Sequence, residues 1–295
     1  MCVYEASVLV LYYVKVLCDN LKNGEISVMW QKNCYRIVVK VGTSTLTHDT
    51  GMANLHSIEA LVRVLADLKG YGHEVILVTS GAISVGTAKM RLPKRPKELR
   101  MKQAAAAVGQ CQLMHLYDKF FTEYNRTVAQ ILLTDEDVAD DMRREHLKGT
   151  FEALLETGII PIVNENDSVS SAEIETGAAK VLGDNDTLSA IVAKLVDADL
   201  LILLSDIDGL FDKDPHKHDD AKIVHKVTDI ASVEQMAGGA GTRRGTGGMV
   251  TKLSAAGIAT EAGCDMVITN GARPEDIYDI VAGKETGTRF IAKEK

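Results

Sequence analysis

Residues 35–44 read YRIVVKVGTS, a run of β-branched residues that leads directly into a glycine. Apolar side chains stand at successive rather than alternating positions, which is typical of a strand covered on both faces of a sheet. Similar runs recur along the chain, and amphipathic helical stretches separate them. That alternation favours right-handed crossovers. We therefore predict an α/β protein, a three-layer α/β/α sandwich with a mainly parallel sheet of about eight strands.

The other strands are predicted from short apolar runs that end at turn residues. They lie at 74–79, 127–133, 159–163, 200–204, 223–227, 266–269 and 288–291. Apolar residues at helical spacing predict helices at 55–68, 99–121, 187–196 and 251–262. We expect Asn54 to cap the first of these helices and Gly70 to end it, and the acidic run 135–141 to begin an exposed helix.

The composition is that of an ordinary globular protein with an acidic surface. The chain has 295 residues, of which 46% are hydrophobic and 25% charged, and its formal net charge is −8. This balance supports a core of ordinary size and argues against the basic surface that nucleic acids and anionic membranes require. Five cysteines without a CxxC pair favour reduced thiols over disulfides or zinc. We therefore expect a cytoplasmic protein with no nucleic-acid and no membrane partner.

The first 34 residues do not share this pattern. Residues 8–17 read VLVLYYVKVL, an apolar run shorter than the roughly 20 residues of a membrane-spanning helix. Neither a basic segment nor a convincing cleavage site accompanies it, which argues against a signal peptide. We expect residues 1–34 to be an N-terminal extension outside the core, or an upstream start that precedes Met29. Residues 35–295 are expected to form one domain.

The unusual residues of the chain follow the predicted strands, at the carboxyl ends where open α/β sheets bind ligands. Lys40 is the first of them. Burying a lysine without an anionic partner is costly. Lys40 therefore either binds an anion or lies on an edge strand from which its amine reaches solvent. Gly42, two residues on, lets the backbone approach a ligand closely and favours phosphate binding.

Residues 183–187 read GDNDT and precede a predicted apolar helix. Asp186 or Thr187 can cap that helix by accepting hydrogen bonds from its free backbone N–H groups. Alternatively, a carboxylate that takes no part in capping can orient a catalytic lysine. On the pattern alone, we favour capping.

Two glycine-rich segments, 238–241 and 245–248, precede the helix that contains Lys252. Backbone N–H groups in such segments can surround phosphate oxygens, although a flexible surface loop has the same composition. Neither segment matches the P-loop pattern or the dinucleotide-binding GxGxxG pattern after a strand. The sequence therefore argues against both of those nucleotide-binding classes.

Eight segments, in this order, resemble the glutamate 5-kinases (γ-glutamyl kinases), which belong to the amino acid kinase family. They are VVKVGTSTL at 38–46, VTSGAISVG at 78–86, AAVGQ at 106–110, VNENDSV at 163–169, GDNDTLSA at 183–190, LLSDIDGLF at 203–211, GTGGMVTK at 245–252 and NGARP at 270–274. The resemblance extends over residues 35–293. It implies the amino acid kinase fold.

The resemblance also implies roles for individual residues. Lys40 and Lys252 correspond to the catalytic lysines that stabilise the transferring phosphoryl group, and Asp186 to the aspartate that orients both. The implied glutamate-binding residues are Ser80, Gly81, Asn164, Asp167, Asp184 and Asn185. The implied ATP-binding residues are Lys40, Gly42, Thr43, Ser44, Ser205, Asp206, Thr246, Gly247, Gly248, Met249 and Lys252.

The implied reaction is ATP-dependent phosphorylation of the L-glutamate γ-carboxylate to γ-glutamyl phosphate, the first step of proline biosynthesis. A carboxylate is already ionised near neutral pH, so this reaction needs alignment and charge neutralisation but no general base. ATP is expected with Mg²⁺ held mainly by the nucleotide, and we assign no protein metal ligand. The resemblance further implies proline as a feedback inhibitor and a homo-oligomer, either a dimer or a tetramer.

Three other functions stay open at this point. An enzyme of the same fold that acts on acetylglutamate, aspartate, carbamate or UMP would share many of these motifs. The chain could also be the kinase half of a pyrroline-carboxylate synthase, or a non-catalytic sensor of proline or glutamate. Retention of Lys40, Asp186 and Lys252 argues against the sensor.

Two features depart from the family pattern. The chain ends at Lys295, and the C-terminal PUA domain of many bacterial relatives is absent from it. The loop between Glu173 and Gly183 is longer than in the common bacterial pattern. Because this loop lies beside the expected glutamate site, proline inhibition stays an open question.

Overall fold

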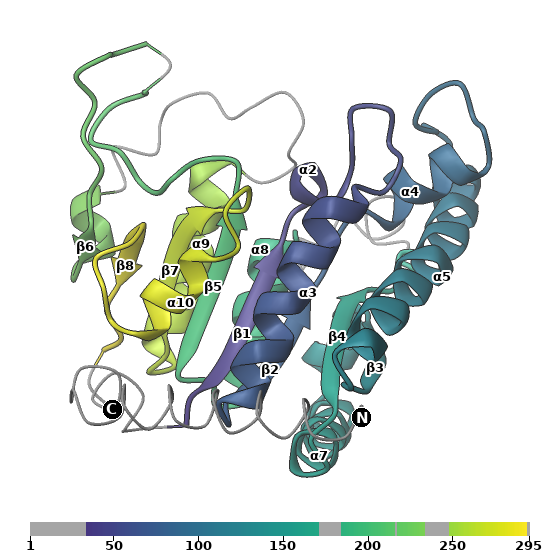
Figure 1. Ribbon diagram of the computed structural model, residues 1–295, viewed down its shortest axis with the longest axis horizontal. Coiled ribbons are helices and arrows are strands. Elements are labelled where there is room, and N and C mark those ends of the chain that lie inside the picture. Colours follow the sequence, from purple (N-terminus) through teal and green to yellow (C-terminus); the bar gives the residue numbers. More distant parts are fainter. Residues whose placement is uncertain (1–33, 171–183, 216, 234–247, 294–295) are drawn as a thin grey trace, which may run out of the picture. The chain divides into compact units, whose positions relative to one another are not determined.

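The computed structural model describes residues 34–170, 184–215, 217–233 and 248–293. One compact unit spans Tyr35–Lys295. In its described part, the sheet has eight strands in the order β3-β4-β2-β1-β5-β7-β8-β6 (Figure 1). The strands are β1 Arg36–Val41, β2 Glu74–Val78, β3 Val128–Leu133, β4 Ile160–Glu165, β5 Leu200–Ser205, β6 Lys226–Val227, β7 Asp265–Asn270 and β8 Thr288–Phe290.

The described sheet is parallel except where β7 pairs with β8. β1 pairs with β2 on one side and with β5 on the other, so it lies in the middle of the sheet. Lys40 of β1 stands opposite Val78 of β2 and Leu203 of β5. Because parallel strands run in one direction, the chain leaves β1, β2, β4 and β5 at the same edge. That edge is where the candidate site lies.

Helices cover both faces of the sheet. They are α2 Thr43–Leu46, α3 Leu55–Gly70, α4 Ala82–Lys89, α5 Leu99–Glu123, α6 Asp135–Ala139, α7 Asp141–Glu156, α8 Asn185–Leu195, α9 Met249–Glu261 and α10 Asp276–Val281. Helices α3, α5 and α10 pack against one face, where Ile37 and Val39 of β1 contribute to the core. Helices α7, α8 and α9 pack against the other face, where Val38 lies. In Figure 1, α3 and α10 cross in front of the sheet and α8 lies behind it.

Two glycines let α4 and α5 approach closely. A Cβ atom at Gly86 of α4 would lie 1.8 Å from the carbonyl oxygen of Ala105. A Cβ atom at Gly109 of α5 would lie 1.7 Å from the carbonyl oxygen of Ala82. Any side chain at either position would force the two helices apart. The close crossing brings α5 next to the loops that follow β2 and β4.

The predicted three-layer sandwich with a mainly parallel sheet is confirmed. The side chain of Asn54 accepts a hydrogen bond from the Ser57 N–H at 3.2 Å and caps α3, which ends at Gly70 as predicted. The strand predicted at 223–227 is wrong in its first half, because β6 is only Lys226–Val227. Ile223 instead forms a bridge to Phe211.

Some predictions fall on residues outside those described. Residues 1–33 of the expected extension, the loop at 173–183 and the glycine-rich segment at 238–241 are among them, and these expectations stay predictions. Among the helices that the structure describes, none combines the length and apolar character needed to cross a bilayer.

Candidate functional site

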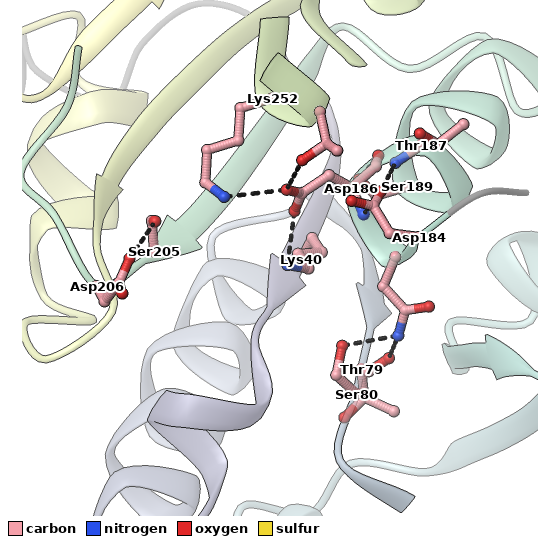
Figure 2. A network of polar contacts seen from close by, with 12 residues as sticks. Lys40, Thr79, Ser80, Asp184, Asp186, Thr187, Ser189, Ser205, Asp206 and Lys252 are labelled. Carbon is pink, nitrogen blue, oxygen red and sulfur yellow. Dashed lines mark hydrogen bonds and ion pairs between the residues drawn. The ribbon is translucent and has the colours of Figure 1, made fainter. Parts of the chain in front are cut away.

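The carboxylate of Asp186 lies between two lysine amines (Figure 2). Nζ of Lys40 is 2.6 Å from Oδ1 of Asp186, and Nζ of Lys252 is 3.0 Å from Oδ2. Lys40 belongs to β1, Asp186 to the first turn of α8 and Lys252 to the first turn of α9. The side chains of Lys40, Lys252 and Asp186 are 11%, 8% and 2% exposed. These three side chains together carry two buried positive charges and one negative charge, a balance that favours binding of an anion.

The pKa of Asp186 lies below its ordinary value. Burial acts to raise the pKa of this carboxyl group, but the ammonium groups of Lys40 and Lys252 outweigh burial and lower it. Asp186 is therefore ionised near neutral pH. It can hold both amines in place while leaving the group of three with an excess of positive charge.

The residue that caps the start of α8 is neither Asp186 nor Thr187. Oδ1 of Asp184 accepts hydrogen bonds from the backbone N–H groups of Asp186 at 3.1 Å and Thr187 at 3.0 Å. Asp184 is therefore the N-cap of α8, and the prediction that Asp186 or Thr187 caps this helix is wrong. Because the cap is supplied two residues earlier, the Asp186 side chain contacts the lysines instead.

The position of Lys40 excludes one of the two interpretations of this residue. A lysine on an edge strand could extend its amine into solvent, but β1 has a paired strand on each side. The side chain is instead held by the ion pair with Asp186. Desolvation of the amine is offset by that carboxylate, which explains how a lysine is retained in an otherwise apolar central strand.

Asn185 lies between the two aspartates and contacts the ends of β2 and β4. Its Nδ2 atom is 2.7 Å from the carbonyl oxygen of Thr79, 2.7 Å from Oγ of Ser80 and 3.1 Å from Oδ1 of Asn164. Nδ2 of Asn164 in turn donates to Oε1 of Gln110 at 2.9 Å. These contacts form one polar network that joins α8, β2, β4 and α5, and Figure 2 shows the part of it around Thr79 and Ser80.

Two turns with glycine lie side by side next to Lys40. Gly42 precedes α2, and a Cβ atom at this position would lie 3.7 Å from Nζ of Lys40. Gly81 precedes α4 with φ of 91°, a left-handed conformation that favours glycine. A Cβ atom at Gly81 would lie 3.6 Å from the Thr43 side chain. Ser44, the next residue of α2, is exposed.

The residues expected to contact nucleotide lie near Lys252. Oγ of Ser205, at the end of β5, donates to Oδ1 of Asp206 at 3.1 Å, and Figure 2 places this pair on the Lys252 side of the site. Gly248 is the N-cap of α9 and Met249 its first residue, so both lie within one turn of Lys252. Thr246 and Gly247 lie outside the described residues, and their expected role stays a prediction.

A pocket of about 350 Å³ opens on the opposite side, between α5 and the loop that follows β4. Ala82, Met114 and Leu132 supply apolar walls, and Gln110 and Asp167 supply polar groups. Asp167 is thus brought next to the Asn185 network through Gln110. Among the described residues, no group of three or more His, Cys, Asp or Glu side chains could hold a metal ion.

The sequence reasoning missed two residues that take part in these contacts. Oγ1 of Thr251 lies 3.4 Å from Oδ2 of Asp186, and its position next to Lys252 was the available signal. Gln110 ends the segment AAVGQ, which carried part of the resemblance without an assigned role. Its contact with Asn164 joins residues that are far apart in the sequence, so spacing could not have revealed it.

Comparison with known proteins supports one family. Residues 35–270 match the amino acid kinase family. The chain is 55% identical to the glutamate 5-kinase of Clostridium perfringens, in an alignment that covers 89% of this chain and 97% of the relative. It is 52% identical to the glutamate 5-kinase of Listeria innocua, covering 90% and 95%.

Solved structures share the fold at lower identity. Carbamate kinase from Giardia lamblia aligns with a TM-score of 0.63 and 13% identity, covering 88% of this chain and 99% of that one. UMP kinase from Bacillus anthracis aligns with a TM-score of 0.59 and 16% identity, covering 89% and 98%. At such identities the likeness concerns the fold alone.

Proposed function

The chain belongs to the amino acid kinase family, within its glutamate 5-kinases, and from this premise we propose that it phosphorylates the γ-carboxylate of L-glutamate with ATP. The product γ-glutamyl phosphate is the first intermediate of proline biosynthesis. The observation that carries the proposal is the Lys40–Asp186–Lys252 group, two buried amines held by one carboxylate at the ligand-binding edge of the sheet.

The chemistry requires alignment more than proton transfer. A carboxylate oxygen of glutamate forms a bond to the γ-phosphorus of ATP, and the bond from that phosphorus to the bridging oxygen breaks to release ADP. No proton moves, because the attacking carboxylate is ionised near neutral pH. In the transition state, negative charge spreads over the transferring oxygens. Fixed positive groups in a site with little water stabilise that charge most strongly.

In this proposal, Lys40 and Lys252 supply those positive groups. Lys40 approaches from the centre of the sheet and Lys252 from the start of α9, so they reach Asp186 from two elements. Asp186 holds both amines in place when no substrate is present. The excess positive charge described above is what a bound phosphoryl group would neutralise.

Glutamate is proposed to bind on the β2–β4 side of the lysines. Ser80, Asn164 and Asn185 form the connected network there, and Asp167 lines the adjoining pocket. Gly81 lets the chain turn sharply between Ser80 and α4. Asp184 acts through α8, because its carboxylate fixes the helix start that carries Asn185.

ATP is proposed to bind on the β5–α9 side. Ser205 and Asp206 contact the nucleotide, and Gly248 and Met249 precede Lys252 at the phosphates. The turn at Gly42, Thr43 and Ser44 brings backbone next to Lys40 for further phosphate contacts.

We propose that Mg²⁺ accompanies ATP, held mainly by phosphate oxygens and water. The described residues fit this arrangement, since Lys40, Lys252 and the backbone at Gly42 are available to bind phosphate. When bound, the ion would neutralise phosphate charge. Proline inhibition, a dimer or tetramer and a cytoplasmic location are further parts of this proposal, supported by the family.

An assay of purified protein with ATP and Mg²⁺ tests the function. Hydroxylamine traps an acyl phosphate as a hydroxamate, and L-glutamate, N-acetylglutamate, aspartate and UMP are compared as acceptors. We expect ATP-dependent hydroxamate with L-glutamate alone. Product from another acceptor would assign the site to a different enzyme of this fold, and binding of proline without turnover would favour a sensor.

A further inference from the structure

Gln110 has a buried hydrogen-bond donor that the polar network does not use. The residue is 8% exposed. Its Oε1 atom accepts from Asn164, but among the described residues its Nε2 atom has no hydrogen-bond partner. A buried amide N–H group without a partner costs about 1 to 3 kcal/mol. Such a cost suggests that a ligand supplies the missing acceptor.

The orientation of this amide is set by the network. The carbonyl oxygen of Thr79 can only accept, so the atom of Asn185 that faces it must be the nitrogen. That nitrogen also faces Asn164, which must therefore present its oxygen to Asn185 and its own nitrogen to Gln110. Gln110 consequently accepts through Oε1, and its Nε2 is the atom left over. Reversing the Gln110 amide would place two N–H groups against each other.

The free amide nitrogen belongs to a residue that lines the pocket described above. Ala82, Ala106 and Met114 make part of the wall apolar. Among the described residues that line this pocket, none is a lysine or an arginine. Glu165 and Asp167 also line it, and their carboxylates suit an ammonium group rather than an anion. A carboxylate of the same ligand would therefore depend on neutral donors, and Gln110 is a buried one.

The strand order indicates which end of the substrate this pocket receives. Lys40 lies on β1, whereas the pocket lies beside β3 and β4, and β2 separates β1 from β4. The γ-carboxylate must lie near Lys40 and Lys252 to react. The α-carboxylate and α-ammonium groups of the same molecule then extend toward β4. An amide N–H₂ group can only donate, so it recognises the α-carboxylate and not the ammonium group.

We propose that Gln110 is a substrate-binding residue that determines specificity by donating from Nε2 to the α-carboxylate of L-glutamate. This inference rests on the proposed function and names a contact that the predicted glutamate-binding residues do not include. Through Oε1, Gln110 also holds Asn164 in place. One side chain thus positions the network and selects amino acids that carry a free α-carboxylate.

The variant Gln110→Glu separates these two roles. It keeps an oxygen that can accept from Asn164, removes the donor and places a negative charge opposite the α-carboxylate. We expect kcat/KM for L-glutamate to fall at least about 100-fold. The α-amide of L-glutamate, which offers N–H groups in place of the carboxylate, should lose far less. The preference for glutamate over its α-amide should therefore collapse, while KM for ATP stays within about two-fold.

The neutral variant Gln110→Met provides a second measurement if the buried charge disturbs folding. Loss of a hydrogen bond to a charged group predicts a fall of about 10- to 100-fold in kcat/KM for glutamate. Calorimetric titration with L-glutamate in the absence of ATP should show the same weakening, and circular dichroism checks that each variant is folded. Gln112→Glu is the matched control, because Gln112 lies on the same helix and contacts Lys89 rather than the pocket.

The outcomes distinguish this inference from the proposed function. Wild-type protein that forms no hydroxamate with glutamate would refute the function itself. Active wild-type protein together with folded Gln110 variants that keep both glutamate affinity and the preference over the α-amide would overturn the inference alone. A loss that is equal for glutamate and its α-amide would also overturn it, because a purely structural role gives that result.

Discussion

Asp184 and Asp186 stand two residues apart at the start of α8, and their carboxylates contact entirely different groups. Asp184 accepts from the backbone N–H groups of Asp186 and Thr187, whereas Asp186 contacts the amines of Lys40 and Lys252. One carboxylate therefore fixes the helix start, and the other fixes the two lysine amines proposed to be catalytic. Asn185 between them contacts the opposite side of the site. A single helical turn thus connects the two proposed substrate regions.

Removing Lys252 should abolish most turnover while leaving the fold intact. We expect Lys252→Ala to lower kcat by about 100-fold or more, because a fixed positive group that faces transition-state charge is lost. Hydroxamate formation measures the rate, and circular dichroism measures folding. Lys194→Ala is the control, since Lys194 is an exposed lysine on α8. A folded Lys252→Ala protein with near-normal turnover would refute the catalytic assignment.

Removing the Asp186 carboxylate should affect both activity and stability. Asp186→Asn removes the carboxylate that the amines of both Lys40 and Lys252 contact. We expect kcat to fall by about 100-fold or more. The free energy of unfolding should fall by about 3 kcal/mol, the range seen when one partner of a buried ion pair is removed. Urea unfolding measures the second effect, and unchanged stability would show that the lysines repel each other little.

The stabilising effect of Asp186 should disappear in acid. Its folded-state pKa is lowered, because the two lysines outweigh the raising effect of burial. The stability it contributes is therefore present above its unfolded-state pKa of about 3.9 and is lost as pH falls through the lower folded-state value. The difference in unfolding free energy between wild type and Asp186→Asn should be constant from about pH 5 to pH 7 and shrink below about pH 4. A difference that persists unchanged in acid would contradict this.

Replacing Gly109 and Gly149 by alanine should change the stability of the protein in opposite directions. Gly109→Ala places a Cβ atom 1.7 Å from the Ala82 carbonyl oxygen, so we expect a loss of at least about 2 kcal/mol of stability. Gly149 lies in α7 with nothing within 4 Å of an added Cβ atom. Gly149→Ala should therefore stabilise the protein by about 0.5 to 1 kcal/mol, through reduced backbone entropy of the unfolded chain. Thermal unfolding of both variants gives the signs directly.

Changing one atom of Asn185 should weaken glutamate binding. In Asn185→Asp, a carboxylate oxygen would replace the nitrogen that faces the Thr79 carbonyl and would repel it. We expect KM for L-glutamate to rise at least about 10-fold, since a hydrogen bond of the network is replaced by an unfavourable contact. KM for ATP should change little, because Ser205 and Asp206 lie on the other side of the site. Equal effects on both substrates would indicate general disruption of α8.

The sheet could be predicted from the sequence because the central strands consist mainly of consecutive apolar residues. β5, for example, was predicted at 200–204 and observed at Leu200–Ser205. β6 was predicted too long, since the pairing of Ile223 with Phe211 depends on a neighbour distant in the sequence. Lys40, Lys252 and Asp186 were identified as candidate site residues from the sequence motifs that contain them. The different contacts of Asp184 and Asp186 could not be predicted, because an aspartate at either position can cap a helix.

The separation of Lys40, Asp186 and Lys252 along the chain has a consequence during synthesis. Ribosomes add about 5 to 20 residues per second, and Lys252 emerges long after β1, β2, β4 and α8. A nascent or truncated chain that stops before α9 already contains Thr79, Ser80, Asn164 and Asn185, the polar network on the glutamate side. Such a fragment would have the residues proposed to bind the amino acid but would lack Lys252, which the proposed phosphoryl transfer requires. On this proposal, phosphorylation begins only once nearly the whole polypeptide has been made.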